Sequence, residues 1–596
     1  MSHVCPILYV RITSNMKIIG YIQEVYMKKA LSILFLLSSV LAITSCSSND
    51  KTKIYAQNEN KNVIEYGDAK LIFKDNSNVP YINIKDGVSL MDKIRKEANP
   101  EKKDVYYKFE IKDNNVVISN ESDAKCTINK TNQTVSFDDY DKFSKITFGV
   151  NPILATDDKL KTDAIKLVKS EYNKGNAVIV DLNKYSKLDI YTDKNEYYLP
   201  VSTFNSLLFQ NLNVGNLHYN LKSLYFVPTS GLFVNIPGVG SAITSLGQHF
   251  SDGINKNKIS GDYFDYNYQS MCLDFDVNYG LKNKFKTFDE FVQANNLKTD
   301  LLQDNVKLID SSTAACLSYL NDGHTLLIKN SLLYEFANGE KMDITKYNPA
   351  RAAYETSNED FIKRRKNAGL VDGIKIYESA PNVAFVTFSE FSPIVDASLY
   401  NPFFESDEDD TAYLFSQLYK TVTNDSRINK VVVDLSANDG GHSDSLIYAL
   451  SVLLGDVTFN MSNPLTGAYN TQTYKADINL DGKIDEKDIG LIDNGVKIYF
   501  INSKYTFSSA NAMTVNAKIL KPNVVTLGET SGGGPCAIKN NMSPLFNIYS
   551  SSSLDCFSKF EGTKLVDIDG GVNADHQLTL DQMIDRESIL SNINNW

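Results

Sequence analysis

The sequence predicts a multidomain α+β protein in which a β-rich N-terminal region and a helical segment precede an α/β core. Its 596 residues exceed what one hydrophobic core usually serves, so at least two domains are expected. Up to about residue 257, short runs of Tyr, Phe, Val and Ile alternate with Asp- and Asn-rich turns, a pattern typical of small β-sheets. Beyond about residue 336, strand-like runs alternate with runs of helical spacing, which favours a sheet covered by helices.

Composition and charge narrow the classes of function. With 42% hydrophobic and 22% charged residues, the chain has the make-up of a folded protein, which excludes disorder as its main state. The 60 Lys and Arg residues are outnumbered by 72 Asp and Glu residues, and the formal charge is −12. An acidic chain without long basic runs lacks the cations that replace counterions on a phosphate backbone, so we expect no nucleic-acid partner.

An export signal begins at Met27, where a short basic segment precedes an apolar run over residues 30–44. The run is too short to span a bilayer comfortably and ends in small residues. Residues 1–26 lie upstream of this signal and are excluded from the expected fold. The four residues that end at Cys46, Ile-Thr-Ser-Cys, resemble the lipobox of bacterial lipoproteins. The resemblance implies a lipid on Cys46 that anchors the chain in the bacterial cell envelope, facing outside the cytoplasm; a secretory signal with an incidental cysteine is the alternative.

The other cysteines form no disulfide framework. After Cys5 and Cys46 are set aside, five widely scattered cysteines remain: Cys126, Cys272, Cys316, Cys536 and Cys556. Of this odd set, Cys536 and Cys556 could pair in an oxidising compartment. Because there is no Cys-x-x-Cys and no cluster of His and Cys at zinc spacing, the sequence disfavours a structural zinc site.

Four regions are expected along the chain. They are the upstream extension with the signal (1–46), the β-rich region (47–257), a helical subdomain (258–335) and the α/β core (336–596). Apolar residues recur at helical spacing over 285–320. In the core, the expected strands are 383–388, 430–435, 496–501 and 524–527, and the expected helices are 443–454 and 508–520. Such a sheet places catalytic groups at its strand ends.

Four segments carry residues suited to catalysis, and each has an ordinary structural alternative. His324 ends the helical segment, although a lone histidine is more often structural. Gly440 and Gly441 follow a strand, where they let backbone N–H groups face a ligand or simply form a tight turn. Ser508 opens a helix, where its hydroxyl lies near the positive end of the helix dipole or merely caps the helix. A glycine-rich loop, 528–534, follows the next strand.

In this order, the segments resemble those of the C-terminal processing (tail-specific) serine proteases over about residues 285–596. Residues 434–441 are similar to that family's Asp-x-Arg-x-Asn-x-Gly-Gly. Residues 506–511 are similar to its Thr-Ala-Ser-Ala-Ser-Glu, and residues 528–534 to its Gly-Glu-x-Thr-x-Gly. The resemblance implies a core of the ClpP/crotonase-like type and hydrolysis of peptide bonds.

The resemblance also implies roles for individual residues. It places the nucleophile on Ser508, with Ser509 as a rival if the segment is shifted by one residue. The backbone N–H groups of Ser509 and of Gly440 or Gly441 would hold the oxyanion of the tetrahedral intermediate.

Departures from the family pattern favour the branch of the tricorn protease core and the retinoid-binding-protein repeats. Gly533 and Gly534 occupy the place of the lysine that the processing branch uses. The other branch takes a histidine base from an upstream Asp-Gly-His-Thr-like segment, a role that His324 fits. The tricorn core has a serine directly before that histidine, where this chain has Gly323, and Asn511 stands where the family has Glu.

An acid must orient the imidazole so that its free nitrogen can take the serine proton. The family's acidic residue before Gly-Val-x-Pro-Asp corresponds by position to Asp569. Asp567 and Asp322 are its rivals.

Residues 477–488 match the spacing of an EF-hand calcium loop, with Gly482 at the sharp turn of position 6. A solvated acidic turn is the alternative, and the presence of only one such loop disfavours a dockerin. We expect calcium as a structural cofactor held in a weak site. The expected ligands at positions 1, 3, 5, 7, 9 and 12 are Asp477, Asn479, Asp481, the carbonyl of Lys483, Asp485 and Asp488.

Together these observations predict an exported, lipid-anchored serine endopeptidase that acts on peptide or protein substrates. No PDZ-like segment is recognisable, so selection of C-terminal tails is not expected. One alternative is a surface binding protein that keeps the fold without catalysis, which the missing lysine, Asn511 and Gly323 favour. A second alternative is a Ser-Lys enzyme that uses Lys539.

Overall fold

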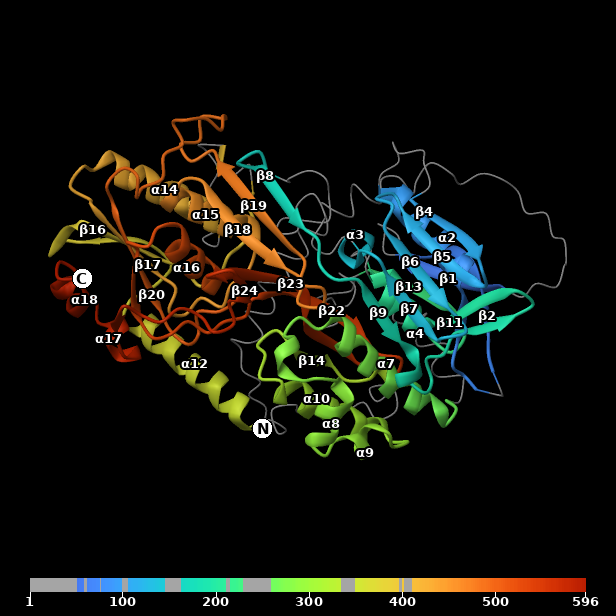
Figure 1. The fold of residues 1–596 in the computed structure, drawn as a ribbon. Helices are drawn as coiled ribbons and strands as arrows, with labels where there is room; N and C mark the ends of the chain where they lie inside the picture. The colour runs from blue at the N-terminus through green and yellow to red at the C-terminus, as the bar shows by residue number, and fades with distance from the viewer. Residues whose placement is uncertain are drawn as a thin grey trace.

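The computed structural model has β-sheets at the N-terminal end and an α/β core at the C-terminal end, with helices between them (Figure 1). Residues 1–50, including the export signal and Cys46, lie outside the described residues. None of the described helices is long and apolar enough to span a bilayer. The structure describes residues 51–57, 62–74, 77–98, 106–144, 162–210, 215–228, 259–333, 349–395, 399–400 and 410–596.

Two mostly antiparallel sheets build the N-terminal region, drawn in blue and teal in Figure 1. The first has the order β10-β11-β3-β2-β1-β13-β12, with strands Tyr191–Asp193, Glu196–Pro200, Tyr81–Asn83, Val63–Ile72, Lys51–Gln57, Leu224–Pro228 and Gly215–Tyr219. The second has the order β4-β5-β6-β7-β9, with strands Tyr107–Lys112, Asn115–Asn120, Lys125–Asn129, Thr134–Phe137 and Val178–Asp181. Alternate residues of β5 are buried, as expected for a sheet with one face on the core. The helices of this region are α2 (Ile84–Ala98), α3 (Tyr140–Ser144) and α4 (Val201–Phe204).

The helical segment packs against the N-terminal region in one continuous hydrophobic core. Its helices are α7 (Asp262–Asn278), α8 (Phe288–Ala294), α9 (Lys298–Leu301) and α10 (Val306–Tyr319). The side chains of Thr287 and Asn305 cap α8 and α10 by accepting backbone N–H groups of the first turn, which explains where these helices begin. The helical spacing over 285–320 therefore corresponds to three short helices rather than one.

A six-stranded sheet forms the α/β core and is parallel except for its first pair. Residues of β17 alternate between two apolar clusters, because Val431 and Val433 pack on one face and Val432 on the other. The order is β15 (Gly373–Tyr377), β16 (Ala380–Thr387), β17 (Lys430–Asp434), β20 (Lys497–Asn502), β21 (Val525–Gly528) and β25 (His576–Gln577). The helices are α12 (Pro349–Asn367), α14 (Thr411–Asn424), α15 (Ser443–Leu454), α16 (Ser509–Leu520), α17 (Leu580–Ile584) and α18 (Arg586–Asn592).

A seven-stranded sheet joins the three regions of the chain. Its main path is β14-β23-β18-β19-β8, and β22 and β24 also pair with β23. β8 comes from the N-terminal region and β14 from the helical segment, whereas the other strands come from the core. The expected boundaries at 257 and 335 lie outside the described residues, so they stay predictions. The strands are Leu326–Lys329, Ile548–Glu561, Val457–Ser462, Tyr469–Ala476 and Ile165–Asn173 for the path, with β22 Cys536–Met542 and β24 Lys564–Asp567.

Candidate active site

Ser508 lies at the sharp junction between β20 and α16. Its backbone has φ 54° and ψ −124°, a combination that side-chain-bearing residues rarely adopt and that is typical of functional turns. The Ser508 N–H donates to the carbonyl of Gly533 (2.9 Å), and the Ser508 side chain makes no capping hydrogen bond. The rival Ser509 is 3% exposed, and its hydroxyl donates to the carbonyl of Gly441 (2.8 Å). The local geometry therefore favours Ser508 over Ser509 as the nucleophile.

The glycine turn after β17 lies directly against this junction. A Cβ atom on Gly440 would lie 2.6 Å from the Ser508 Cβ and 2.9 Å from the Ser509 nitrogen, so only glycine fits. The Gly440 N–H donates to the Asn438 side chain (2.9 Å). Gly441 is exposed and, within the described residues, neither its N–H nor that of Ser509 has an acceptor in the structure. Of the two glycines, Gly441 is therefore better placed to donate to an oxyanion.

His324 lies in the turn between α10 and β14 and contacts the residue before the predicted nucleophile. Its ring packs edge-on against the Phe507 ring, with 4.8 Å between the ring centroids. A Cβ atom at Gly323 or Gly534 would lie 2.5 or 2.4 Å from the Phe507 ring. Glycine at position 323, where the tricorn core has serine, thus makes room for Phe507. The structure brings the histidine turn and the serine junction together through this ring.

Asp322 holds the backbone of the histidine turn. Its carboxylate accepts three hydrogen bonds: from the backbone N–H of His324 (3.0 Å), from the Thr325 hydroxyl (2.6 Å) and from the Tyr279 hydroxyl (3.1 Å). Burial, followed by the Asp322 charge, raises the pKa of Tyr279, so this phenol stays a donor at neutral pH. Asp322 therefore has a structural role in fixing the histidine turn, which the sequence did not indicate.

Asp569 lies on the loop side of the site. Its carboxylate accepts the Gly534 N–H (3.2 Å) and lies 3.8 Å from the Lys284 ammonium. Burial raises the pKa of the Asp569 carboxyl; Gly534 and Lys284 oppose this, and the charges of Asp567 and Asp322 add to it. Asp569 therefore belongs to the same charge cluster as Asp322 and shares the loop that holds the Ser508 N–H. Its role as the orienting acid stays a prediction.

Asn511, which stands where the family has glutamate, forms uncharged hydrogen bonds to two other segments. Its side-chain N–H₂ donates to the Ile568 carbonyl (3.0 Å), and its oxygen accepts the Ser531 hydroxyl (2.7 Å). The Ser531 hydroxyl in turn accepts the Val572 N–H (2.8 Å). Asn511 therefore ties α16 to the segment that carries Asp569.

Lys539, the base of the Ser-Lys alternative, lies on β22. Burial lowers the pKa of its ammonium group, and the carboxylates of Asp274 and Asp555 oppose this shift. Asp274 belongs to α7, in the helical segment, and not to the serine junction. The Ser-Lys alternative therefore gains no support from the surroundings of Lys539.

The predicted calcium loop folds with the register of its oxygen ligands intact. The side chain at position 1 accepts the backbone N–H of position 6 (2.8 Å), and the side chain at position 3 accepts that of position 5 (2.8 Å). The side chain at position 5 accepts the backbone N–H of position 7 (3.0 Å), and the side chain at position 9 accepts that of position 11 (2.9 Å). The Asp488 carboxylate accepts the N–H groups of Ile478 (2.7 Å) and Asp485 (2.8 Å). Within the described residues, however, no three His, Cys, Asp or Glu side chains converge as a metal site. The donor chemistry suits calcium, and the calcium site stays a prediction.

A known protein family matches the part of the chain that carries Ser508 and the glycine turn. The sequence profile of Peptidase family S41 matches residues 382–545, which include the glycine turn and Ser508 but neither His324 nor Asp569. No curated protein matches the chain. Among solved structures, a putative peptidase from Parabacteroides merdae ATCC 43184 is 15% identical over 55% of this chain and 95% of its own, with a TM-score of 0.38.

Two further solved structures have a similar sequence identity to this chain. A lipoprotein from Streptococcus agalactiae is 16% identical over 56% of this chain and 96% of its own, with a TM-score of 0.34. The photosystem II D1 C-terminal processing protease is 15% identical over 35% of this chain and 46% of its own, with a TM-score of 0.26. Within the α/β core, the segment that carries the glycine turn and the serine junction is thus similar to peptidase family S41, a family of serine peptidases.

Proposed function

We propose that the chain is an exported, lipid-anchored serine endopeptidase that cleaves peptide bonds through Ser508. The observation that carries the proposal is the serine junction itself. The strained Ser508 backbone leaves its hydroxyl outside the helix cap, Gly440 lies directly against Ser508 and the Ser509 nitrogen, and the next residue of the turn, Gly441, is exposed. This is the combination of nucleophile and oxyanion donors that acyl transfer requires.

The proposed reaction assigns one task to each group. The Ser508 hydroxyl attacks the substrate carbonyl while His324 takes its proton, and His324 then gives that proton to the leaving amine. Asp569 orients the imidazole. The N–H groups of Gly441 and Ser509 hold the oxyanion, and the loss of one such donor typically costs about 3 kcal/mol in the barrier.

A covalent fluorophosphonate probe tests the nucleophile directly. Wild type should be labelled, and Ser508→Ala should not be. Ser509→Ala keeps its backbone N–H and should still be labelled, which separates the two candidate serines. If wild type reacts no more than Ser508→Ala does, the peptidase proposal fails and a binding protein on the same fold is favoured.

The disulfide between Cys536 and Cys556 supports export. It joins β22 to β23, and such bonds persist in oxidising compartments outside the cytoplasm. Lipid anchoring rests on the sequence around Cys46. In a bacterial host, the wild-type chain should take up radiolabelled palmitate and sediment with membranes, and Cys46→Ala should do neither. Incorporation into Cys46→Ala equal to that of wild type would overturn the anchor.

Calcium binding is the third part of the proposal, supported by the ligand register of residues 477–488. A bound cation would stabilise the loop between β19 and β20, because it binds the folded state alone. Thermal unfolding should occur at a higher temperature in millimolar calcium than in EGTA, and Asp481→Asn should remove most of this difference. Equal unfolding temperatures in calcium and EGTA would show that the loop is a solvated acidic turn.

A further inference from the structure

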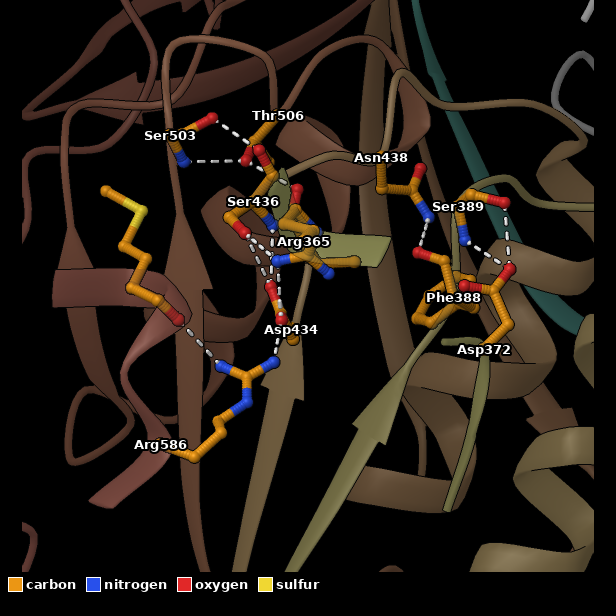
Figure 2. A network of polar contacts seen from close by, with 12 residues as sticks. Arg365, Asp372, Phe388, Ser389, Asp434, Ser436, Asn438, Ser503, Thr506 and Arg586 are labelled. Carbon is orange, nitrogen blue, oxygen red and sulfur yellow. Dashed lines mark hydrogen bonds and ion pairs between the residues drawn. The ribbon is translucent and has the colours of Figure 1, made fainter. Parts of the chain in front are cut away.

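A buried ion cluster closes the end of β17, beneath the glycine turn. Asp434 is fully buried, and Arg365 and Arg586 are each 5% exposed. The Arg365 guanidinium lies 2.9 Å from one oxygen of Asp434, and the Arg586 guanidinium contacts the same oxygen (Figure 2). Burial alone would raise the pKa of the Asp434 carboxyl, but the two guanidinium charges outweigh it and hold the pKa well below its usual range. The cluster is therefore ionised at neutral pH.

One branch of the cluster reaches the strand end through Ser436. The Ser436 hydroxyl accepts from Arg365 (2.6 Å) and donates to the other Asp434 oxygen (2.7 Å), as Figure 2 shows. In the motif that residues 434–441 resemble, arginine stands at this position. Here a serine takes its place, and the guanidinium arrives from the last turn of α12. A helix from another part of the chain thus supplies what the strand itself lacks.

From there the contacts continue into the loop that leads to the nucleophile. The Ser503 hydroxyl donates to the Ser436 carbonyl (2.5 Å), and the Thr506 hydroxyl donates to the Leu435 carbonyl (2.8 Å). The Phe507 N–H donates to the Asn438 carbonyl (3.1 Å). The segment before Ser508 is therefore held by three of the four residues that follow β17.

The same residues also hold the glycine turn. The Asn438 side chain accepts the Gly440 N–H (2.9 Å) and donates to the carbonyl of Phe388, the residue after β16 (3.1 Å). The two predicted oxyanion donors, the N–H groups of Gly441 and Ser509, therefore lie at the two ends of one network that starts at the ion cluster.

We propose that Arg365 and Arg586 are positioning residues of the oxyanion hole. Resting on the proposed function, this assigns them the task of fixing the end of β17 against the serine loop, so that both donors face one oxygen. Neither arginine touches substrate. Because a displaced donor weakens binding of the oxyanion more than binding of the neutral substrate, disruption should lower kcat and leave KM nearly unchanged.

The variants Arg365→Met and Arg364→Met form a matched pair on α12. Arg364 pairs with Asp360 (3.0 Å) and with Asp581 at the surface and does not contact Asp434, so its loss should leave kcat near wild type. Arg365→Met should lower kcat with a small peptide substrate by roughly 10- to 100-fold, less than the complete loss of one oxyanion donor. KM should change by no more than about threefold, as expected when only transition-state binding is weakened. Arg365→Lys should recover part of the loss.

A second variant keeps the proposal testable if Arg365→Met does not fold. Ser436→Ala cuts the branch to the strand end and leaves both ion pairs in place. It should also lower kcat without raising KM, with a melting temperature close to that of wild type. If both Arg365→Met and Ser436→Ala keep the wild-type kcat, the positioning role is refuted.

Hydrogen–deuterium exchange separates this inference from the proposed function. In Arg365→Met, but not in Arg364→Met, amides of residues 435–441 and 503–509 should exchange faster than in wild type. If the wild-type protein fails to react with the probe and this faster exchange is still seen, the peptidase function has failed and the positioning network stands. If wild type reacts and Arg365→Met shows neither faster exchange nor a lower kcat, the network does not position the donors.

Discussion

The serine half and the histidine half of the candidate site are held by different parts of the fold. Ser508 and the glycine turn both lie at strand ends of the six-stranded sheet, where β17 and β20 pair in parallel register. His324 arrives from the helical segment, between α10 and β14, and β14 pairs with β23 of the seven-stranded sheet. The two halves meet at the contact between the His324 and Phe507 rings.

This difference in construction separates what is fixed locally from what depends on the whole fold. The serine half is set by neighbouring parallel strands, and it falls within residues 382–545, where the family profile matches. The histidine half depends on the packing of three regions of the chain. Variants can therefore test each half, and the joint between them, separately.

The largest effect is expected from removing the base in the histidine half. In His324→Gln, kcat should fall by about 10⁵- to 10⁶-fold, as when one member of a catalytic unit is lost. Phe507 keeps a polar neighbour of similar size, so the fold should be retained. Steady-state kinetics with active-site titration measures the loss. A variant that retains most of its activity would show that the site works without the histidine half.

A smaller loss, with a gain in stability, is expected for Asp569→Asn. If Asp569 orients the imidazole, kcat should fall by up to about 10⁴-fold. The pKa of this carboxyl is raised by burial, so its ionised form costs stability in the fold. That cost is absent below the unfolded pKa of 3.8 and fully present above the raised folded value. Asp569→Asn should therefore unfold at a higher temperature than wild type at pH 7, and the difference should shrink towards pH 3.8.

Two contrasting results would reassign the acid. If Asp569→Asn keeps full activity while Asp322→Asn loses it, Asp322 is the orienting group. If Asp569→Asn is less stable than wild type at pH 7, the contacts with Gly534 and Lys284 outweigh the cost of burial.

An intermediate effect is expected at the joint between the halves, where the Cys536–Cys556 disulfide lies. Cys536 follows closely on the loop that holds the Ser508 N–H, and a Cβ atom on Gly280 would lie 2.7 Å from its sulfur. Gly280 directly follows Tyr279, whose hydroxyl bonds to the carboxylate that holds the histidine turn. Cys536→Ser together with Cys556→Ser should lower kcat about tenfold through small misplacements of the reacting groups. Loss of this loop closure should also lower the free energy of unfolding by about 3 kcal/mol.

Treatment with a reductant provides the control for the disulfide. It should lower the activity of wild type and leave the double serine variant unchanged. The described free cysteines, Cys126, Cys272 and Cys316, are buried, so they should not respond. If both proteins lose activity equally, the reductant acts elsewhere.

The sequence predicts the serine half well because its signals are local. The helix expected at 443–454 has those bounds in the structure, and β17 ends one residue before the expected position. The positive-φ turn at Gly440 and Gly441 can be anticipated from the paired glycines. Periodicity and turn chemistry act over a few residues, so they specify where strands end and where a helix begins.

The residues that hold the site in place could not be predicted, because the two members of each contact are far apart in the sequence. Arg365 and Arg586 are 69 and 152 positions from Asp434, and each stands in a charged helical segment typical of a solvated surface. Phe507 and Gly323 meet only through tertiary packing. Nothing in the sequence of β8 indicates that it pairs with β19 of the core. Long-range pairing leaves no local pattern.

The smallest effect is expected for Lys539→Met, and it bears on which half supplies the base. Lys539 lies among the carboxylates of Asp274 and Asp555, and burial lowers the pKa of its ammonium. Because a methionine of similar length keeps the packing and the proposed mechanism gives this lysine no contact with the transition state, we expect kcat to stay within about twofold of wild type. The pH profile of kcat/KM should likewise be unchanged, because the proposed mechanism assigns the serine proton to His324 rather than to this lysine. Loss of turnover in Lys539→Met, with His324→Gln still active, would move the base from the histidine half to β22 and make the chain a Ser-Lys enzyme.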